Sequence, residues 1–459
     1  MRHIEVNRIY NMNCLEGMRQ LESNTVDLIV SDPPYGYSFM GKDWDKSVPS
    51  VAIWKECLRV LKPGAFAFIM SAPRLDVQSQ MAIRLQEAGF RVDFTPIYWT
   101  YASGFPKAMN IGKAVDKKFG VERDVITTVT KFIPVASTGH FSNDRSDGKG
   151  VGFKNEYAIT APATLQAKAL DGSYAGFQPK PAVEVIIVAM KPLSEKTFVD
   201  QALKNRKGIT WLDEGKIPTG EPEQPLRQRR AGSEFGQNSS WNNHNNIDTM
   251  YDPNKGRFPA NLLVSDDVLN DGIVRESGDL TGQLHGSKQI YGDYTPKQNY
   301  HKGDLGSFSR FFDIDKWFSE RVKHLPPEVQ EVFPFLIVPK AAKSEKNEGC
   351  ENVEGVVRFA SENESGHFLP TKTDNSHKIK GNFHPTVKPL KLMSYLVILG
   401  SRPNDLILDP FLGSGTTAIA AQLLSRKFIG FELDAEYFKI AQARIRVSKV
   451  QSKLTDIAA

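Results

Sequence analysis

The amino-acid sequence predicts an α/β fold in which a parallel sheet is assembled from two distant parts of the chain. Apolar strands alternate with amphipathic helices over roughly the first hundred residues, and the same alternation returns at residues 405–432. Between these parts, residues 208–300 are rich in Gly, Asn, Ser, Pro and Gln and lack sustained periodicity. We therefore expect three regions, at residues 1–200, at residues 201–330 as a loop-rich insertion, and at residues 331–459.

Each element of the predicted sheet follows from a short apolar run bounded by turn residues. In chain order we expect a strand at residues 26–30, a helix at 51–61, a strand at 64–70, a helix ending near Gly89, core strands at 183–189 and 335–339, and strands at 405–409 and 427–432 that each lead into a helix. This interpretation requires the two ends of the chain to meet on one sheet.

Composition and charge limit the class of protein. The chain has 459 residues, enough for two or three structural units, and it has no apolar run of the ~18 residues that a membrane helix needs. Its first residues lack a secretory or transit signal, so we expect a cytoplasmic protein. A formal net charge of +5 is too small for this length to establish a polyanionic partner. Cys14, Cys57 and Cys350 lack metal-ligand spacing, so we expect free thiols and no metal site.

A glycine-rich turn near the C-terminal end is a candidate ligand site. The string LILDPFLGSGTTAIAAQLL runs from an apolar strand through Gly413 and Gly415 into a helix. Glycines allow close approach to the backbone, and the start of a helix offers unpaired N–H groups. Glu432 ends the next strand at about the spacing at which doubly wound folds place an acid on a ribose. A nucleoside ligand fits both features, although a purely structural turn fits the glycines equally well.

A second motif, Asp32-Pro33-Pro34-Tyr35, follows the first predicted strand. The two prolines remove backbone donors, so the Asp32 carboxylate and the neighbouring carbonyls present acceptors alone. The amino group of a nucleobase supplies two N–H donors, and Tyr35 supplies a flat face on which a base rotated out of a duplex can stack. The alternative interpretation is a Pro-Pro turn that only terminates the strand.

Together the two motifs resemble those of the amino-methylating DNA methyltransferases that use S-adenosylmethionine. This family pairs a D/N/S-P-P-Y/F motif with an F-x-G-x-G motif, here residues 411–415, and a third match is HPTVKP at residues 384–389. In this chain the catalytic motif comes first and the cofactor motif last, which resembles the order in the permuted beta group of the family. The resemblance covers residues 5–120 and 330–447, and the segments SFMGKDWD and GFPKAMNIGKAVDK are similar to a phage- and prophage-associated branch.

The resemblance implies a Rossmann-like S-adenosylmethionine-dependent methyltransferase fold with permuted motif order and an inserted target-recognition region. Where the family often has Asp-Cys near the N-terminus, this chain has Asn13-Cys14, and Asn13 can equally cap a helix at residues 15–21. HPTVKP can likewise simply begin a helix at residues 390–399. The resemblance assigns cofactor binding to Asn13, Cys14, Asp32, His384, Thr386, Lys388, Asp409, Phe411, Gly413, Ser414, Gly415, Thr416 and Glu432.

The catalytic residues implied by the resemblance are Asp32, Pro33, Pro34 and Tyr35; Asp32 and the Pro33 carbonyl would accept the two hydrogens of the amino group during methyl transfer. The expected substrate is double-stranded DNA methylated at adenine N6, with cytosine N4 as the alternative. Because no cysteine stands in a Pro-Cys context, methylation of cytosine C5 is disfavoured. RNA methylation and a nucleic-acid-binding protein without activity are less favoured. The sequence leaves open a homodimer and a cognate restriction endonuclease.

Two further segments are expected to contact DNA. The insertion carries Arg227, Arg229 and Arg230, which are candidate phosphate or guanine contacts, although a solvated charge cluster is an equally simple interpretation. Phe39, Met40 and Trp44 follow the catalytic motif and suggest either a lid over the flipped base or an apolar surface that joins two subunits.

Overall fold

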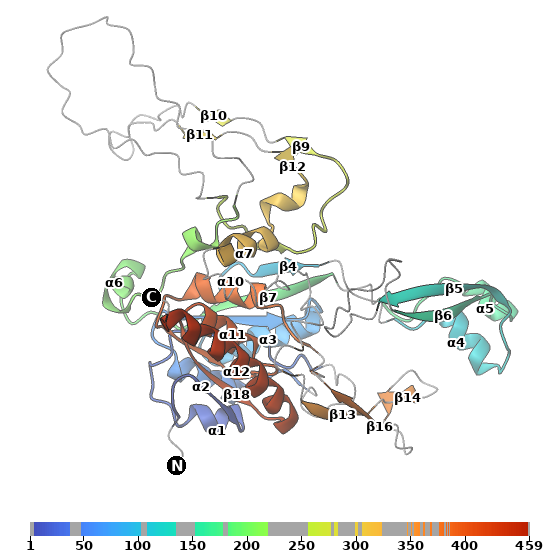
Figure 1. Cartoon of the computed structure of the whole chain (residues 1–459), viewed down its shortest axis with the longest axis horizontal. Helices are drawn as coiled ribbons and strands as arrows, with labels where there is room; N and C mark the ends of the chain where they lie inside the picture. The colour runs from blue at the N-terminus through green and yellow to red at the C-terminus, as the bar shows by residue number, and fades with distance from the viewer. Residues whose placement is uncertain are drawn as a thin grey trace, which may run out of the picture. The chain divides into compact units, whose positions relative to one another are not determined.

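The computed structural model describes residues 4–36, 47–101, 108–134, 152–177, 182–218, 256–276, 280–282, 299–301, 305–323 and 386–457, together with short stretches between residues 347 and 384. The chain divides into two compact units (Figure 1). The larger unit contains Met1–Ser103 and Ala182–Ala459, and the smaller unit contains Gly104–Pro181. The sequence did not indicate the smaller unit.

An eight-stranded sheet forms the centre of the larger unit, in the order β1-β18-β17-β2-β3-β7-β4-β8. All neighbouring strands run parallel except β7, which runs antiparallel to both β3 and β4. The strands are β1 (Arg8–Asn11), β2 (Leu28–Ser31), β3 (Phe66–Ser71), β4 (Ile97–Thr100), β7 (Val183–Met190), β8 (Leu262–Val264), β17 (Leu406–Asp409) and β18 (Lys427–Glu432). The predicted strands at residues 26–30, 64–70, 183–189, 405–409 and 427–432 are confirmed, and residues 335–339 lie outside the described part of the chain.

The two ends of the chain meet at the middle of this sheet. Strand β2 pairs in parallel with β17, with Leu28 opposite Ile407 and Ile29 opposite Leu408. Strand β1 likewise pairs with β18. Strands β2 and β17 are largely buried on both faces, and their sequences, LIVS and LILD, are accordingly apolar up to the last residue. The predicted α/β fold with a sheet built from distant segments is therefore confirmed.

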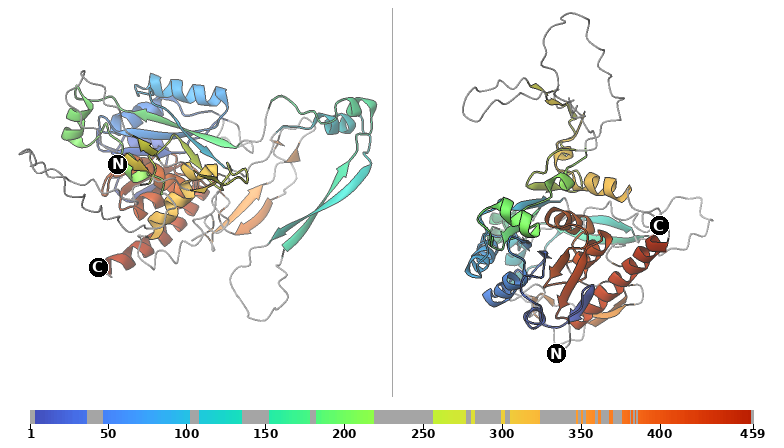
Figure 2. Two further views of the ribbon diagram at one scale, coloured as in Figure 1. Left: turned by 90° about the horizontal axis from the view of Figure 1, so that it is seen from above. Right: turned by 90° about the vertical axis from the view of Figure 1, so that its left-hand side faces the viewer.

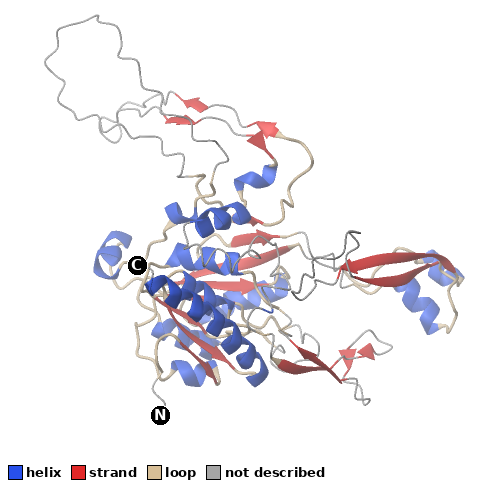
Figure 3. Cartoon of the chain, in the orientation of Figure 1, coloured by secondary structure: helices blue, strands red, loops and turns tan. Residues whose placement is uncertain are grey.

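Helices cover both faces of the sheet (Figures 2 and 3). The bluish N-terminal helices and the orange to red C-terminal helices lie on opposite sides, as the right-hand view of Figure 2 shows. The first face carries α1 (Cys14–Met18), α2 (Val51–Val60) and α3 (Leu75–Glu87), and the second carries α7 (Ile314–Lys323), α10 (Leu390–Gly400), α11 (Thr416–Leu423) and α12 (Ala435–Ile457). None of the helices that the structure describes is both long and apolar enough to cross a membrane.

Helix α10 is the most buried element of the second face. It begins directly after Pro389, as predicted, and all of its residues are buried because it lies between the sheet, α7 and α11. Its one charged residue, Lys391, is paired with Asp315 of α7. A buried charge with a partner costs far less than one without, so this pair fixes α7 on α10.

The smaller unit is a long antiparallel hairpin with two short helices. Strands β5 (Val125–Pro134) and β6 (Gly152–Thr160) pair with each other, and α4 (Ile111–Lys118) contacts α5 (Leu165–Ala169). Buried Asp116 of α4 accepts hydrogen bonds from the backbone N–H groups of Ala163 and Thr164 and forms an ion pair with Arg123. These contacts tie the helices to the end of the hairpin.

The remaining described elements are short. Helix α6 (Phe198–Asn205) follows β7, and two 3-10 helices occur at Leu212–Gly215 and Phe308–Phe311. Four antiparallel pairs join β9 (Arg275–Glu276) to β12 (Leu305–Gly306), β10 (Leu280–Gly282) to β11 (Asn299–His301), β13 (Glu354–Arg358) to β16 (Ser376–Lys380), and β14 (Ser361–Glu362) to β15 (Phe368–Leu369).

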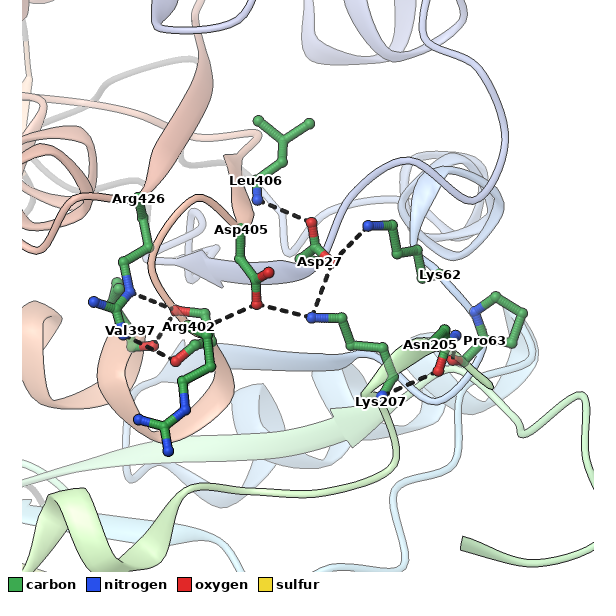
Figure 4. Close-up of polar contacts among 11 residues, drawn as sticks. Asp27, Lys62, Pro63, Asn205, Lys207, Val397, Arg402, Asp405, Leu406 and Arg426 are labelled. Atoms are coloured by element: carbon green, nitrogen blue, oxygen red, sulfur yellow. Dashed lines mark hydrogen bonds and ion pairs between the residues drawn. The ribbon is translucent and has the colours of Figure 1, made fainter. Parts of the chain in front are cut away.

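A charged cluster closes the amino ends of β2 and β17. Lys207 lies between Asp27 and Asp405, with its Nζ 2.9 Å from a carboxylate oxygen of each, and Lys62 is 2.7 Å from Asp27 (Figure 4). The second oxygen of Asp27 accepts a hydrogen bond from the backbone N–H of Leu406. We call Asp27, Lys62, Lys207 and Asp405 the amino-end cluster. It links β2 of the early segment to β17 of the late segment.

Candidate active site

The two predicted motifs lie at the carboxyl ends of neighbouring strands. Asp32 follows β2, and the glycine loop at residues 413–415 follows β17. Since β2 and β17 are adjacent and parallel, the two motifs emerge at the same edge of the sheet. The hydroxyl of Ser31 donates a hydrogen bond of 2.5 Å to the buried carboxylate of Asp409, which joins the two strands at this edge. The sequence prediction that the motifs share a site thus has its structural basis in strand order.

Asp32 is held by two side chains from opposite ends of the chain. The Tyr35 hydroxyl donates to Oδ1 of Asp32 at 2.6 Å, and the Lys388 Nζ donates to Oδ2 at 2.7 Å. The ammonium group of Lys388 also lies 5.6 Å from the centre of the Tyr35 ring. Lys388 is only 8% exposed, so this contact is made with little competition from water. Three residues expected at the site are therefore in contact.

A fourth residue of this group, Glu184, was not identified from the sequence. Its Oε2 lies 3.2 Å from the Lys388 Nζ, and its side chain is 18% exposed. Burial alone would lower the pKa of Lys388, but the carboxylates of Asp32 and Glu184 outweigh burial and raise it well above its usual value. Lys388 is therefore a stable cation between two carboxylates. We call Asp32, Glu184 and Lys388 the carboxyl-end cluster.

The glycine loop has a backbone that other residues would adopt only with strain. Gly413 has φ +54° and Gly415 has φ +85°. A Cβ at Gly413 would lie 2.9 Å from Nε2 of His384, and one at Gly415 would lie 3.2 Å from Cβ of Ala441. Both glycines are thus required by conformation and by space, and Gly415 also caps the start of α11.

Glu432 holds the glycine loop through its carboxylate. One oxygen accepts a hydrogen bond of 2.7 Å from the backbone N–H of Gly413, and the other accepts one of 2.8 Å from the N–H of Asp434. Burial raises the pKa of Glu432 to about 7 despite these two donors. The acid expected on a ribose therefore lies directly against the loop.

The start of the loop is organised by Asp409 and Phe411. The Asp409 carboxylate accepts from the backbone N–H of Phe411 at 3.1 Å as well as from Ser31, and burial raises its pKa to about 6. The Phe411 ring meets Trp54 of α2 edge-on, with ring centres 6.1 Å apart. These contacts fix the loop to the sheet and to a helix of the opposite face.

Arg444 of α12 is a second residue that the sequence did not indicate. Its guanidinium donates to the carbonyl of Ser414 at 2.7 Å, to the Ser414 hydroxyl and to the Thr416 hydroxyl at 3.1 Å. The side chains of Ser414 and Thr416 are thus turned toward α12, and both residues are buried. No local motif marks Arg444, because its role depends on the packing of α12 against α11.

Of the remaining expected cofactor residues, His384 lies beside the same loop, against Gly413. The His384 ring packs against Tyr437 of α12 at 4.4 Å between ring centres, and its Nδ1 accepts from the N–H of Thr386 at 3.3 Å. Asn13 caps α1 by accepting from the N–H of Leu15 at 2.9 Å, which is the alternative that the sequence left open.

All three cysteines are free and buried, as expected. Burial raises the pKa of Cys14 to about 12, and the carboxylates of Glu432 and Asp409 contribute to the rise. The pKa of Cys57 is raised as well, mainly by burial. Neither thiol is available as a thiolate nucleophile, which agrees with chemistry that needs no covalent enzyme intermediate.

Two sets of residues expected to contact DNA lie outside the described part of the chain. They are the expected lid residues, Phe39, Met40 and Trp44, and the arginines of the insertion, Arg227, Arg229 and Arg230.

A doubly wound sheet with the Asp-Pro-Pro-Tyr turn beside a glycine loop has the arrangement expected of an enzyme that binds a nucleoside ligand at this edge. The chain belongs to the N6/N4 DNA methylase family, whose model, described as DNA methylase, matches residues 26–443. The predicted family of S-adenosylmethionine-dependent DNA methyltransferases is thereby confirmed.

Similar proteins include two curated type II methyltransferases. The chain is 47% identical over 73 residues to M2.LlaDCHI of Lactococcus lactis subsp. cremoris, and 47% identical over 62 residues to M2.DpnII of Streptococcus pneumoniae. These matches cover 16% and 14% of this chain and only 27% and 23% of those proteins. The chain thus spans about a quarter of the length of the curated relatives it matches.

Solved structures show a more distant likeness. The cytosine-N4-specific PvuII DNA methyltransferase is 12% identical with a TM-score of 0.38, over 96% of this chain and 86% of that chain. A putative DNA modification methylase from Thermus thermophilus is 13% identical with a TM-score of 0.32, over 95% of this chain and 93% of that chain. Similarity at this level adds nothing to the fold, which follows from the sheet order.

Proposed function

We propose that this DNA methyltransferase transfers a methyl group from S-adenosylmethionine to the N6 amino group of adenine at a specific sequence in double-stranded DNA. One observation carries the proposal: the Asp32 carboxylate and the glycine loop emerge side by side from β2 and β17. The order of the motifs supports the permuted beta group, and Asp as the first residue of the catalytic motif is the form we associate with adenine.

The residues at the carboxyl end of β17 suit a nucleoside cofactor. Gly413 has positive φ and carries no Cβ, so the backbone of the loop offers its amide groups to a ligand at close range. Glu432 already lies at the loop and, when ionised, has lone pairs left for ribose hydroxyls. His384, Thr386, Asp409 and Phe411 would complete the pocket. When bound, S-adenosylmethionine supplies an electrophilic methyl group on a sulfonium.

Asp32 would act on the amino group of the base. An aromatic amine is a poor nucleophile because its lone pair is delocalised into the ring. By accepting an amino hydrogen, Asp32 favours a pyramidal nitrogen, and its negative charge stabilises the positive charge that develops there. The nitrogen gains the methyl carbon and must lose one proton, and Asp32 is positioned to accept that proton. Tyr35, which holds Asp32 through its hydroxyl, also offers its ring to the base.

Residues 201–330 are proposed as the target-recognition region, with Arg227, Arg229 and Arg230 as candidate DNA contacts. Residues 1–200 and 331–459 would supply the catalytic and the cofactor-binding parts of the transferase. Phe39, Met40 and Trp44 would then cover the flipped base.

The test is methylation of unmodified DNA with labelled S-adenosylmethionine, followed by digestion to nucleosides and identification of the labelled base. The proposal expects N6-methyladenine from the wild-type chain and no label with Asp32→Ala. Label in N4-methylcytosine would contradict the choice of adenine, and label only in RNA would contradict DNA as substrate.

A further inference from the structure

Glu184 reaches the catalytic edge because of the direction of its strand. It is the second residue of β7, the one antiparallel strand of the sheet, and it pairs with Trp99 near the carboxyl end of β4. An antiparallel strand begins where its parallel neighbours end. The first residues of β7 therefore lie at the same edge as Asp32, although this part of the chain carries neither motif.

The carboxyl-end cluster holds more negative than positive charge. Two carboxylates, Asp32 and Glu184, share the single ammonium group of Lys388, at 2.7 Å and 3.2 Å. The negative charge of Glu184 also contributes to raising the pKa of Tyr35 and of Tyr101, after burial. The cluster therefore carries a net charge of about −1 at an edge where a sulfonium is expected and an amine becomes positive.

Both oxygens of Asp32 are engaged in this structure. Oδ1 accepts from Tyr35 and Oδ2 accepts from Lys388. An amino group that donates to Oδ2 would share this oxygen with the Lys388 ammonium group and weaken the ion pair between Lys388 and Asp32. A buried ammonium that simply lost its partner would be strongly destabilising. Glu184, already 3.2 Å away, offers Lys388 a second carboxylate.

We propose that Glu184 is a positioning residue for methyl transfer, which retains Lys388 when the target amino group takes Oδ2 of Asp32 and keeps the cluster negative. This inference rests on the proposed function. Glu184 acts through Lys388 and Asp32 and need not touch the base.

The substitution Glu184→Gln tests this role, because it keeps the shape of the side chain and removes its charge. We expect the single-turnover rate of methyl transfer to fall about 10- to 100-fold, the range seen when a partner that orients a metal ligand is removed. The Kd values for S-adenosylmethionine and DNA should change much less than the rate, because Glu184 acts through Lys388 and Asp32 on the transfer step. Glu184→Asp, which keeps the charge, should recover part of the lost rate.

Glu214→Gln is a matched control. Glu214 also bridges two cations, Arg321 and Arg402, but it lies on a 3-10 helix away from the carboxyl-end cluster. Its substitution should leave the transfer rate per folded molecule unchanged. The double variant Glu184→Gln, Lys388→Met should transfer the methyl group only slightly more slowly than Lys388→Met alone. Each change removes the ion pair between Glu184 and Lys388, so their effects on the rate should not add.

Three results would overturn the inference. The first is a wild-type rate of methyl transfer in Glu184→Gln. The second is a loss of this rate in Glu214→Gln as large as that in Glu184→Gln. The third is an undiminished effect of Glu184→Gln on the rate when Lys388 has already been replaced by Met. Failure of the proposed function would look different, because the wild-type chain itself would then produce no methylated adenine in DNA.

Discussion

The two charged clusters at opposite ends of β2 are made of similar groups but differ in balance. At the amino end, Lys62 and Lys207 face Asp27 and Asp405, so two cations match two carboxylates. At the carboxyl end, the ammonium group of Lys388 faces both Asp32 and Glu184. Asp27 and Asp32 are only one short strand apart. On the proposed function, the amino-end cluster serves stability, whereas the carboxyl-end cluster serves the chemistry.

The surroundings of the clusters agree with this division. Burial disfavours the charged form of Asp27, but Lys207, the N–H of Leu406 and Lys62 outweigh it and lower the pKa of the carboxyl. Next to the carboxyl-end cluster, burial raises the pKa of Asp409 to about 6 and that of Glu432 to about 7. The surroundings at the amino end of β2 thus stabilise the ionised form of Asp27. The surroundings at the carboxyl end destabilise the ionised forms of Asp409 and Glu432.

The largest effect is expected from Asp32→Asn. The change keeps the shape of the side chain but removes the negative charge and the proton acceptor. We expect the single-turnover rate of methyl transfer per folded molecule to fall about 10³-fold or more. The free energy of unfolding should fall as well, because the buried Lys388 ammonium group loses one of its two carboxylates. A loss of stability without a loss of rate per folded molecule would mean that Asp32 is structural and would remove the distinction between the clusters.

The matched change at the other end, Asp27→Asn, should act on stability instead. It leaves the ammonium group of Lys207 with one carboxylate fewer in a buried site, and we expect the free energy of unfolding to fall by about 3 kcal/mol. Urea unfolding measures this loss, and the transfer rate per folded molecule should not change. Lys62 provides the milder comparison, because its side chain is 33% exposed and its ion pair with Asp27 competes with water. Lys62→Met should lower the free energy of unfolding by at most about 1 kcal/mol.

The two ends should also respond oppositely to pH. The lowered pKa of Asp27 gives stability that is present above its unfolded value and is lost as the pH falls through the folded value. The raised pKa values of Asp409 and Glu432 give stability that is present in acid and is lost as the pH rises through about 6 and about 7.

Cofactor binding reports on the same acids at the carboxyl end. If ionised Glu432 is the binding form, the affinity for S-adenosylmethionine should weaken about tenfold for each pH unit below about 7. Calorimetric titration over this range, with Glu432→Gln as the comparison, measures the slope. The variant should bind weakly with little dependence on pH in this window, and an unchanged slope in the variant would assign the titration to another group.

The sequence was most informative where function depends on local backbone chemistry. Asp32 and Tyr35 flank two prolines, and Gly413 has positive φ within a glycine-rich turn. Each residue therefore belongs to a short motif that can be found in the sequence alone. Lys388 was found in the same way, within HPTVKP. The strands at residues 26–30, 64–70, 183–189, 405–409 and 427–432 followed from apolar runs of the expected length.

What the sequence did not reveal depends on contacts between distant segments. Glu184 is one acid in the apolar strand VEVIIVAM, and only the antiparallel direction of that strand brings it to Lys388. A buried strand looks the same in either direction, because its apolar residues do not alternate. Arg444 and Lys207 were missed for a related reason, since their partners lie far away in the sequence.

The central claim is that residues 356 apart in the sequence, Asp32 and Lys388, belong to one site in which the late glycine loop presents a methyl donor to the early carboxylate. An experimental structure with S-adenosylmethionine bound tests it most directly. The account predicts the ribose at Glu432, the backbone of residues 413–415 against the cofactor, and the methyl group facing the Asp32 carboxylate. A cofactor bound elsewhere, or with its methyl group directed away from Asp32, would contradict it.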